Sequence, residues 1–284
     1  MTTLTPPDAG LIAAAVQAAL AEDLGSAGDI TSAATIPQDA QATATFGSRR
    51  AGTLCGLPFA EAAFRAVDPS VQFQPVAHDG DRLVPGEVVA RVQGNARAVL
   101  AAERVALNYL CHLSGVATAT AALVDRVKHT RAVILDTRKT TPGLRTFEKY
   151  AVRCGGGTNH RIGLYDAILI KDNHIAVAGG AAEAIRRARA HAPGKSLEIE
   201  VGSLDELALA MTERPDIVLL DNMSVDEMRE AVAFVSGRAK LEASGNVTLD
   251  TIAAIAETGV DYISSGWITH SAPALDLGLD VVVE

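Results

Sequence analysis

The sequence predicts an α/β protein in which a (β/α) barrel follows a smaller N-terminal module. From about residue 117 onward, continuous apolar segments of strand length alternate with helical segments, a pattern typical of a parallel sheet. The 284 residues suffice for one barrel and one additional module. The chain has neither a G-x-G-x-x-G after a first strand nor a G-x-x-x-x-G-K-[ST], so the dinucleotide-binding and P-loop folds lack their fingerprints.

Composition excludes several classes of protein. Hydrophobic residues make up 48% of the chain, which permits a packed core, while a net charge of -9 and an aromatic content of 4% argue against nucleic-acid binding. The three cysteines, Cys55, Cys111 and Cys154, form no C-x-x-C, which indicates a reducing compartment without a zinc knuckle. No signal peptide is recognisable and no apolar run approaches the ~20 residues of a membrane span. We therefore expect a cytoplasmic protein that binds neither nucleic acid nor membrane.

The N-terminal module is expected to begin with a helix over residues 10–24, capped by Asp8. Short strands are predicted at residues 42–46, 71–73 and 88–92, separated by turn signals. Residues 80–92 look like the small β-sandwich of biotin and lipoyl carriers. The first lysine of the chain is Lys128, so no ε-amine is available there and a carrier function is excluded.

The remaining elements are read from their periodicity. Residues 97–113 predict a helix that ends at the boundary signal Ser114-Gly115. The series after it comprises predicted helices at 117–129, 180–191, 204–212, 225–235 and 248–258, and predicted strands at 132–136, 167–171, 197–201, 216–221, 240–243 and 261–265.

A basic segment stands out in this acidic chain. Between Thr137 and Arg161 the only acidic residue is Glu148, and Gly, Pro and Thr interrupt the segment as in a shaped loop. The cations of this segment are Arg138, Lys139, Arg145, Lys149, Arg153 and Arg161. Such an excess predicts an anion site, because arginine suits carboxylate and phosphate and lysine acts as a point charge. A solvated basic face is the alternative.

Polar residues follow each of the predicted strands from 132–136 onward. Chemistry in (β/α) barrels lies at the carboxyl ends of the strands, so these residues are candidates for one shared site. In chain order they are Asp136 with Arg138 and Lys139, then Lys171, Glu200, Asp221 with Asn222, Ser244-Gly245-Asn246, and Ser264-Ser265-Gly266.

Two groups among these strand ends suggest particular ligands. Ser244-Gly245-Asn246 precedes Thr248, a candidate N-cap, and such a turn could hold a phosphate with Ser265-Gly266 as its other wall, although a plain turn is the alternative. Glu200 and Asp221 follow successive strands and could share a magnesium ion; alternatively they are ion-pair partners of the basic segment.

The motifs of the chain closely resemble those of quinolinate phosphoribosyltransferase, also called nicotinate-nucleotide pyrophosphorylase (carboxylating), over nearly the whole length. The resemblance lies in ordered motifs rather than in composition. They are Glu103-Arg104-Val105-Ala106-Leu107-Asn108, Leu113-Ser114-Gly115-Val116-Ala117-Thr118, Thr137-Arg138-Lys139-Thr140-Thr141-Pro142-Gly143, Gly155-Gly156 with Asn159-His160-Arg161, Leu169-Ile170-Lys171-Asp172-Asn173-His174, Glu198-Ile199-Glu200-Val201, Leu219-Leu220-Asp221-Asn222-Met223 and Glu242-Ala243-Ser244-Gly245-Asn246.

The resemblance implies a reaction in which quinolinate and 5-phosphoribosyl 1-pyrophosphate give nicotinate mononucleotide, pyrophosphate and carbon dioxide, as part of de novo NAD biosynthesis. It implies an N-terminal α/β sandwich domain over residues 1–113, an incomplete TIM-type barrel over 114–271, and a tail, 272–284, that packs back on the N-terminal domain. It also implies Mg2+ as cofactor and a homodimer with shared active sites, which could assemble further into a hexamer of dimers.

Site residues follow by the same resemblance. Lys139, Lys171, Glu200 and Asp221 are the expected catalytic residues, with Glu200 and Asp221 at the ribose hydroxyls and the metal. Arg104 of a partner subunit, with Arg138, His160, Arg161 and Lys171, is expected to hold the quinolinate carboxylates. Thr137 is expected to contact substrate, Lys139 to lie near the pyrophosphate, and Ser244, Gly245, Asn246, Ser265 and Gly266 to bind the 5-phosphate. Trp267 stands where the family pattern leads us to expect a small residue, which puts its local substrate contact in doubt.

Other functions remain open from the residues alone. Lys139 and Lys171 at strand ends could serve a Schiff-base aldolase, but their cationic neighbours favour anion binding. A non-decarboxylating nicotinate phosphoribosyltransferase is a second alternative. The number of arginines argues against it, because it favours a dicarboxylate substrate over the monocarboxylate nicotinate. A phosphate-binding regulator or a molybdate-linked paralogue is a third.

Overall fold

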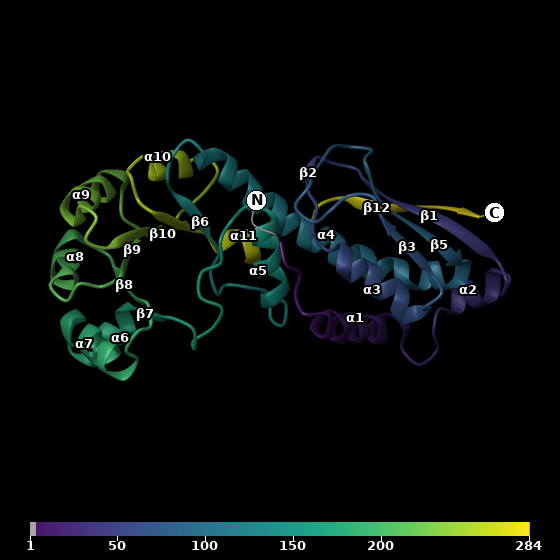
Figure 1. The fold of residues 1–284 in the computed structure, drawn as a ribbon, viewed down its shortest axis with the longest axis horizontal. Helices are drawn as coiled ribbons and strands as arrows, with labels where there is room; N and C mark the ends of the chain where they lie inside the picture. Colours follow the sequence, from purple (N-terminus) through teal and green to yellow (C-terminus); the bar gives the residue numbers. More distant parts are fainter. Residues whose placement is uncertain (1–3, 284) are drawn as a thin grey trace. The chain divides into compact units, whose positions relative to one another are not determined.

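The computed structural model describes residues 4–283, which divide into two compact units (Figure 1). The first, called here the sandwich unit, contains the chain up to Ala119, the segment Thr146–Gly156, and the chain from Ala272 onward. The second, the barrel unit, contains Thr120–Arg145 and Gly157–Ser271. Each unit therefore combines segments that are distant in the sequence.

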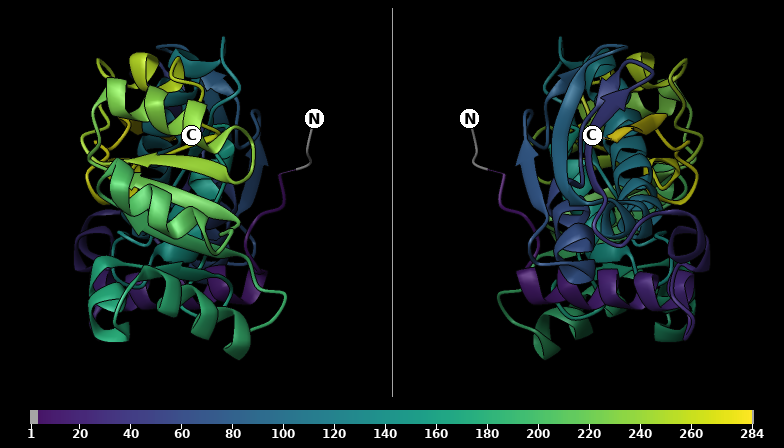
Figure 2. Two further views of the ribbon diagram at one scale, coloured as in Figure 1. Left: turned by 90° about the vertical axis from the view of Figure 1, so that its left-hand side faces the viewer. Right: turned by 90° about the vertical axis from the view of Figure 1, so that its right-hand side faces the viewer.

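The sandwich unit contains an antiparallel sheet in the order β12-β1-β5-β3. Its strands are β1 (Gln41–Ser48), β3 (Gln72–Pro75), β5 (Val88–Asn95) and β12 (Leu277–Val283). Alternate residues of β1 are buried, as expected for a sheet with one covered face. The C-terminal strand β12, yellow in Figure 1 and in the right view of Figure 2, lies beside β1 and is paired with it from Ala42↔Val283 to Ser48↔Leu277.

Helices cover this sheet and close its core. α1 (Ala9–Leu24) begins where Asp8 accepts hydrogen bonds from the Gly10 and Leu11 amides, which confirms the predicted cap. α3 (Leu57–Val67) packs against α1 and contributes Phe64, which lies edge-on to Phe46 with ring centroids 5.8 Å apart. The unit also contains α2 (Ile30–Thr35) and a two-stranded ribbon of β2 (Gly52–Thr53) and β4 (Arg82–Leu83), none of which we predicted.

A single helix, α4 (Ala96–Val127), replaces the two helices predicted at 97–113 and 117–129. The predicted break at Ser114-Gly115 is wrong, because both residues serve packing inside the helix. The Ser114 hydroxyl is buried and bonds the Cys55 backbone, and a Cβ on Gly115 would lie 2.3 Å from the Pro273 carbonyl oxygen. Glycine is thus required here for close approach and not for a turn.

α4 is also long and apolar enough to cross a membrane by length and composition, contrary to the expectation that no segment would be. In its most apolar window, 61% of the residues are buried inside the protein. Leu110, Leu113 and Leu123 are fully buried. The burial identifies α4 as a core helix.

The barrel unit is built on a six-stranded parallel sheet in the order β6-β11-β10-β9-β8-β7. β6 and β7 end the series and do not pair with each other in the described chain, so this TIM-type barrel is incomplete. The strands are β6 (Val133–Leu135), β7 (Ile168–Ile170), β8 (Leu197–Val201), β9 (Ile217–Asp221), β10 (Lys240–Ser244) and β11 (Tyr262–Ser264). All six agree with the predicted strands within one or two residues.

The barrel helices α7 (Ala181–His191), α8 (Leu204–Met211) and α9 (Val225–Val235) confirm the predicted periodicity. They lie outside the strands in Figure 1. Ser203 and Ser224 cap α8 and α9 through their hydroxyls, which accept from the amides of Glu206 and Glu227. The caps fix where each helix starts and therefore the length of the loop between it and the preceding strand.

The sequence misplaced several short helices. α10 spans only Ile252–Ala256 instead of 248–258, because Thr248 and Thr251 bond each other in a turn before it. α5 (Arg145–Cys154) lies within the basic segment that we read as a loop, and its buried Phe147, Tyr150 and Ala151 account for it. α6 (Asp172–Ala178) and α11 (Trp267–His270) were not predicted.

Candidate active site

A cavity of about 660 Å3 opens at the carboxyl ends of the barrel strands. This is the end at which (β/α) barrels carry their chemistry. Eleven of the predicted site residues line it: Thr137, Arg138, Lys139, His160, Arg161, Lys171, Glu200, Asp221, Ser244, Gly245 and Asn246. The parallel sheet thus brings together side chains that are spread over more than a hundred positions of the chain.

Four predicted site residues do not line this cavity. Arg104 is an exposed residue of α4 in the sandwich unit. Ser265 directly follows β11 and is buried, and Gly266 lies against the stem of Lys139, where a Cβ would approach Cδ to 2.9 Å. Trp267 is the first residue of α11 and is half-buried.

Asn222 and Ser264, which the strand-end pattern named as candidates, also line the cavity. Two polar residues were not singled out: Glu242 lines the cavity, and Glu198 is buried beside it. The two-residue period of a strand could have found both glutamates. Glu198 shares a face of β8 with Glu200, and Glu242 shares a face of β10 with Ser244.

Arg138 and Arg161 form the most cationic part of the cavity. The Nε atom of Arg138 is buried and has no hydrogen-bond partner within the described residues. Burial, together with the nearby charge of Arg138, lowers the pKa of Arg161. The guanidinium group of Arg161, whose charge is disfavoured, and that of Arg138, which has an unused buried donor, form a site prepared for an anion.

Lys171 and Glu200 face each other at the ends of β7 and β8. The Lys171 ammonium forms an ion pair and hydrogen bond with Glu200 Oε2. The Lys171 backbone amide also bonds Nδ1 of His174, which fixes the start of α6. The lysine side chain remains 44% exposed, so its charge is accessible from the cavity.

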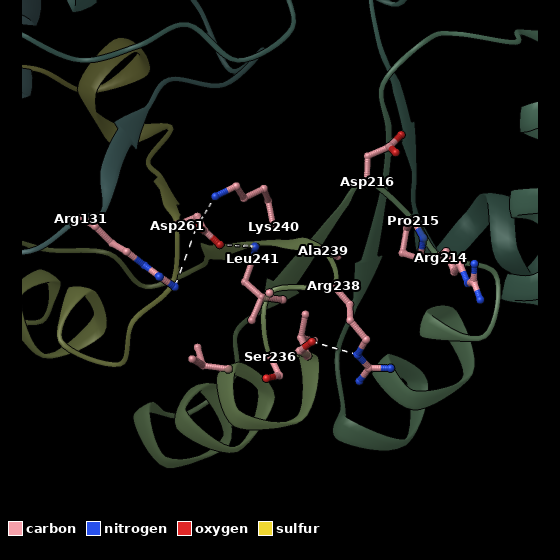
Figure 3. Close-up of a pocket in the computed structure, with 13 residues that line it drawn as sticks. Arg131, Arg214, Pro215, Asp216, Ser236, Arg238, Ala239, Lys240, Leu241 and Asp261 are labelled. Carbon is pink, nitrogen blue, oxygen red and sulfur yellow. Dashed lines mark hydrogen bonds and ion pairs between the residues drawn. The ribbon is translucent and has the colours of Figure 1, made fainter.

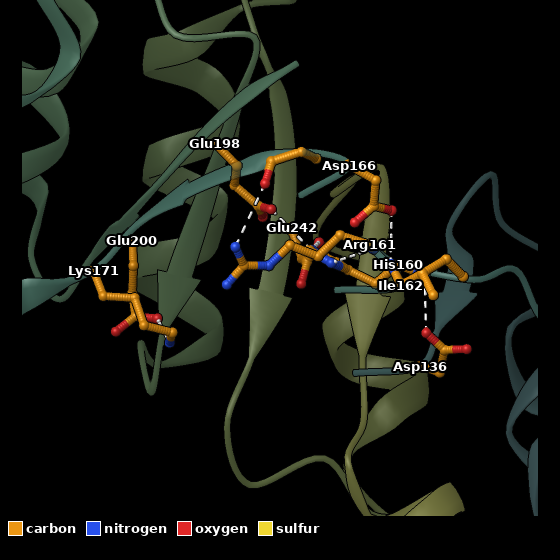
Figure 4. A network of polar contacts seen from close by, with 10 residues as sticks. Asp136, His160, Arg161, Ile162, Asp166, Lys171, Glu198, Glu200 and Glu242 are labelled. Atoms are coloured by element: carbon orange, nitrogen blue, oxygen red, sulfur yellow. Dashed lines mark hydrogen bonds and ion pairs between the residues drawn. The ribbon is translucent and has the colours of Figure 1, made fainter. Parts of the chain in front are cut away.

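His160 is held from three directions (Figure 4). Its backbone N–H donates to Asp136 Oδ1 at 2.9 Å, and Asn159 donates to the other oxygen of that buried carboxylate at 2.6 Å. Nδ1 accepts the Arg161 backbone N–H at 2.8 Å, so it carries no proton. Nε2 lies 2.8 Å from Glu198 Oε2 and donates to that carboxylate.

This arrangement bears on the predicted role of His160. Both ring nitrogens have partners inside the protein, and Nδ1 ties the ring to the backbone of the following residue, Arg161. That His160 contacts a substrate carboxylate stays a prediction.

The loop after β10 is shaped for a small anion. Gly245 has φ +91°, and a Cβ there would lie 2.1 Å from Asn222 Oδ1, so only glycine fits. Asn222 and Asn246 also have positive φ, and the Asn246 amide donates to Asn222 Oδ1 at 3.2 Å. Because α10 starts only at Ile252, the backbone of this loop, rather than the predicted helix N-terminus, would supply the donors.

The donor set next to this loop suits a hard divalent cation. Glu200 and Asp221 supply carboxylates at the ends of adjacent strands, and Asn222 lies beside them with its Nδ2 donating to Asp221 Oδ2 at 2.9 Å. All these metal donors are oxygens, the ligand type that Mg2+ prefers. Glu200 is shared with Lys171, so a cation would compete with that ammonium for the carboxylate.

A second cavity, of about 550 Å3, lies at the opposite, amino ends of β9 and β10 (Figure 3). Two of its cations bind groups of the protein: Lys240 bonds Asp261 at 2.8 Å, and Arg238 donates to carbonyl oxygens at the C-terminal end of α9. Such contacts stabilise helix and strand ends. We assign this cavity to the stability of the barrel and not to its chemistry.

Family models match both parts of the chain. The model described as quinolinate phosphoribosyl transferase, N-terminal domain, matches residues 29–114, and the one described as the C-terminal domain matches residues 116–280. Nicotinate-nucleotide pyrophosphorylase [carboxylating] of Mycobacterium leprae is 45% identical over 273 residues, 94% of this chain and 95% of that protein. Quinolinate phosphoribosyltransferase [decarboxylating] 2a, mitochondrial, of Nicotiana tabacum is 42% identical over 288 residues, 95% of this chain and 82% of that protein.

Solved structures agree with these matches. The nicotinate-nucleotide pyrophosphorylase from Francisella tularensis superposes with a TM-score of 0.95 at 42% identity, covering 99% of this chain and all of that one. Human nicotinic acid phosphoribosyltransferase superposes with a TM-score of 0.59 at 16% identity, which shows a shared fold alone.

Proposed function

Because this chain belongs to the quinolinate phosphoribosyltransferase family, we propose that its barrel cavity binds quinolinate and the ribosyl donor side by side. The enzyme transfers phosphoribosyl from 5-phosphoribosyl 1-pyrophosphate to quinolinate with decarboxylation, in de novo NAD biosynthesis. The products are nicotinate mononucleotide, pyrophosphate and carbon dioxide. What remains to be assigned is the part that each residue plays.

The arginine pair carries our assignment of the quinolinate site. Burial and the nearby charge of Arg138 lower the pKa of Arg161, and the buried Nε of Arg138 has no partner among the residues described. A planar dicarboxylate provides two anionic groups that accept from guanidinium forks. Lys171 adds a point charge from the neighbouring strand end.

The ribosyl donor then occupies the other half of the cavity. The Ser244-Gly245-Asn246 loop would bind its 5-phosphate, and Glu200 with Asp221 would hold the ribose hydroxyls and Mg2+. When bound, the metal would neutralise charge on the pyrophosphate as it leaves. The side chain of Lys139 packs against Gly266, where an added Cβ would lie 2.9 Å from its Cδ. From this position after β6, Lys139 would bind the pyrophosphate.

The reaction needs positioning and fixed charge more than a nucleophilic side chain. The ring nitrogen of quinolinate attacks the anomeric carbon while the bond to pyrophosphate breaks, so positive charge develops on the ribose and negative charge on the leaving group. The carboxylate next to the nitrogen then leaves as carbon dioxide, and its electron pair stays on the ring carbon until a proton arrives. The cations of the cavity stabilise that charge.

Transfer to nicotinate without decarboxylation is the competing chemistry. The test offers quinolinate and nicotinate separately, with the donor and Mg2+, and identifies the nucleotide formed. Nicotinate mononucleotide from quinolinate alone supports the assignment, whereas efficient transfer to nicotinate would contradict it.

The protein is further expected to work in the cytoplasm, in line with three cysteines that form no disulfide.

We further propose a homodimer in which Arg104 completes the partner's site. Arg104 is exposed on α4 and does not line the cavity of its own barrel unit, although the family resemblance assigns it to quinolinate. A two-fold dimer would supply it to both sites equally.

Subunit mixing tests this sharing. At quinolinate concentrations near the KM of the parent, Arg104→Ala and Arg161→Ala homodimers are each expected to be nearly inactive, because every site lacks one arginine. Refolded together, they form hybrids in which one site keeps both residues, so about a quarter of the parent activity should return by random pairing of a symmetric dimer. No recovery, with hybrids demonstrated by a tag on one variant, would mean that Arg104 acts within its own subunit or not at all.

A further inference from the structure

The short helix α11 contacts the basic segment of the chain at Lys139. The strands that precede these two segments are neighbours, because β11 pairs in parallel with β6 and the last pair is Ser264↔Leu135. The Ser265 backbone N–H extends this pairing by donating to the Leu135 carbonyl oxygen at 3.1 Å. The chain therefore leaves both strands at the same edge of the sheet, which brings α11 to the residues that follow β6.

Thr269 of α11 is bonded to the backbone of Lys139, 130 positions earlier in the chain. Thr269 is buried, and its hydroxyl lies 2.7 Å from the Lys139 carbonyl oxygen and 3.1 Å from the carbonyl oxygen of Gly266 in its own helix turn. A bond to the preceding turn is common for threonine in a helix. A hydroxyl has one proton to donate, however, and the shorter distance assigns that proton mainly to Lys139.

The Lys139 backbone is held on both sides by threonine hydroxyl groups. Its N–H donates to Thr137 Oγ1 at 3.0 Å, and its carbonyl oxygen accepts from Thr269. Lys139 itself is exposed and lines the cavity, so burial of the side chain does not fix where its ammonium group lies. These two backbone bonds therefore determine the point from which the lysine stem extends into the cavity.

Gly266 leaves room for that stem. Its φ of −74° is open to any residue, so backbone conformation does not require glycine here. A Cβ on Gly266 would lie 2.9 Å from Cδ of Lys139 and 3.1 Å from Cδ2 of His270. A side chain at this position would therefore displace the lysine stem.

We propose that Thr269 is a positioning residue for phosphoribosyl transfer, which acts by holding the backbone of Lys139 so that the lysine ammonium meets the leaving pyrophosphate. The inference deepens the proposed function and rests on it, because that function assigns Lys139 to the pyrophosphate. Thr269 is buried and does not line the cavity, so its contribution to transfer passes through Lys139. Gly266 supports the same position by leaving space for the stem.

Steady-state kinetics of Thr269→Val, with each substrate varied in turn, tests the proposal. Valine keeps the shape of threonine without the hydroxyl, so the Lys139 carbonyl group loses this donor. The kcat/KM for the ribosyl donor should fall about tenfold, the effect of losing one buried hydrogen bond between neutral groups. The KM for quinolinate should stay within about twofold of the parent value. Thr269→Ser keeps the hydroxyl and should restore most of the lost kcat/KM.

Thr258→Val is the matched control. Thr258 is another buried threonine of the barrel unit, and its hydroxyl donates to the Ile255 carbonyl oxygen, also at 2.7 Å. It lies between α10 and β11, before the strand rather than after it, and does not line the cavity. This variant loses the same kind of hydrogen bond, so its Tm should fall by an amount similar to that of Thr269→Val while its kinetic constants remain those of the parent.

A double-variant cycle with Lys139→Ala shows whether Thr269 acts through this lysine. Without the ammonium group nothing is left to position, so adding Thr269→Val to Lys139→Ala should lower kcat/KM for the ribosyl donor by no more than about twofold. Gly266→Ala reaches the lysine by a second route that leaves Thr269 intact. It should also lower kcat/KM for the donor, and it should have little effect in the Lys139→Ala background.

Three results would overturn the proposal: a kcat/KM for the ribosyl donor in Thr269→Val equal to that of the parent, a Thr269→Ser variant as impaired as Thr269→Val, or an undiminished tenfold loss in the Lys139→Ala background. If Thr269→Val does not fold, Thr269→Ser and Gly266→Ala decide, and a Gly266→Ala variant with the kinetic constants of the parent would equally contradict the inference.

A parent that forms no nucleotide from quinolinate would instead reject the proposed function. Calorimetric titration with inorganic pyrophosphate and Mg2+ then still tests the inference, because it needs no turnover. Pyrophosphate should bind more weakly to Thr269→Val than to the parent and to Thr258→Val. Equal affinities in all three would show that Thr269 does not position Lys139 for this anion.

Discussion

Replacing Arg138 or Arg161 by alanine is expected to raise the KM for quinolinate about a hundredfold while the KM for the ribosyl donor changes only a few-fold. Loss of a charge-assisted, partly buried contact to a carboxylate costs roughly 3 kcal/mol, which corresponds to that factor. The Nε of Arg138 has no partner among the described residues, so Arg138→Ala breaks no internal hydrogen bond of that atom.

Steady-state kinetics with each substrate varied in turn measures this effect. Arg229→Ala is the matched control, since Arg229 is an exposed residue of α9 whose ion pair with Asp226 is local. Equal weakening of both ligands in the Arg138 or Arg161 variant would show that these residues do not hold the carboxylates. The hydrogen bond to His160 Nδ1 comes from the backbone N–H of residue 161, so Arg161→Ala keeps it unless the backbone shifts. The Tm of this variant checks that its fold is unchanged.

Glu200→Gln and Asp221→Asn are expected to lower kcat about a hundredfold to a thousandfold. Both changes keep the size of the side chain but remove a negative charge from the proposed magnesium and ribose site, where positive charge develops during transfer. Glu200→Gln also leaves Lys171 without its carboxylate partner. The concentration of Mg2+ needed for half-maximal activity should rise in both variants.

Titration of activity with Mg2+ tests this assignment, with Asp205→Asn on the exposed face of α8 as the control. A fall in kcat with an unchanged Mg2+ requirement would mean that the two carboxylates hold ribose hydroxyls without the metal. Unchanged kcat would remove them from the site altogether.

The barrel could be read from the sequence because each strand is short, apolar and followed by a polar residue. β8 and β9 were placed within one residue of their observed bounds, and the order of strand ends brought Arg138, Lys171, Glu200 and Asp221 to one edge. The carboxyl ends of parallel strands all lie at the same edge of the sheet, so the topology alone brings these side chains together.

The errors have local physical causes. Ser114-Gly115 reads as a break because Ser and Gly are turn residues, yet tertiary contacts with Cys55 and Pro273 keep α4 continuous. α10 starts late because Thr248 and Thr251 satisfy each other, a side-chain competition that periodicity does not register.

The two buried glutamates of the cavity, Glu198 and Glu242, could not be brought together from the sequence. Glu198 and Glu242 lie in apolar strand segments 44 positions apart, and only the sheet brings them to the same imidazole. A strand period places each on the inner face, but it gives neither their mutual distance nor the tautomer of His160. The meeting of both carboxylates at His160 therefore became visible only in three dimensions.

Decarboxylation coupled to phosphoribosyl transfer is tested by supplying quinolinate labelled in the carboxyl group next to the ring nitrogen, together with the ribosyl donor and Mg2+, and collecting the released gas. Labelled carbon dioxide is expected in equal amount to pyrophosphate, dependent on both the donor and the metal. Pyrophosphate release without labelled carbon dioxide, or label released without the donor, would contradict it.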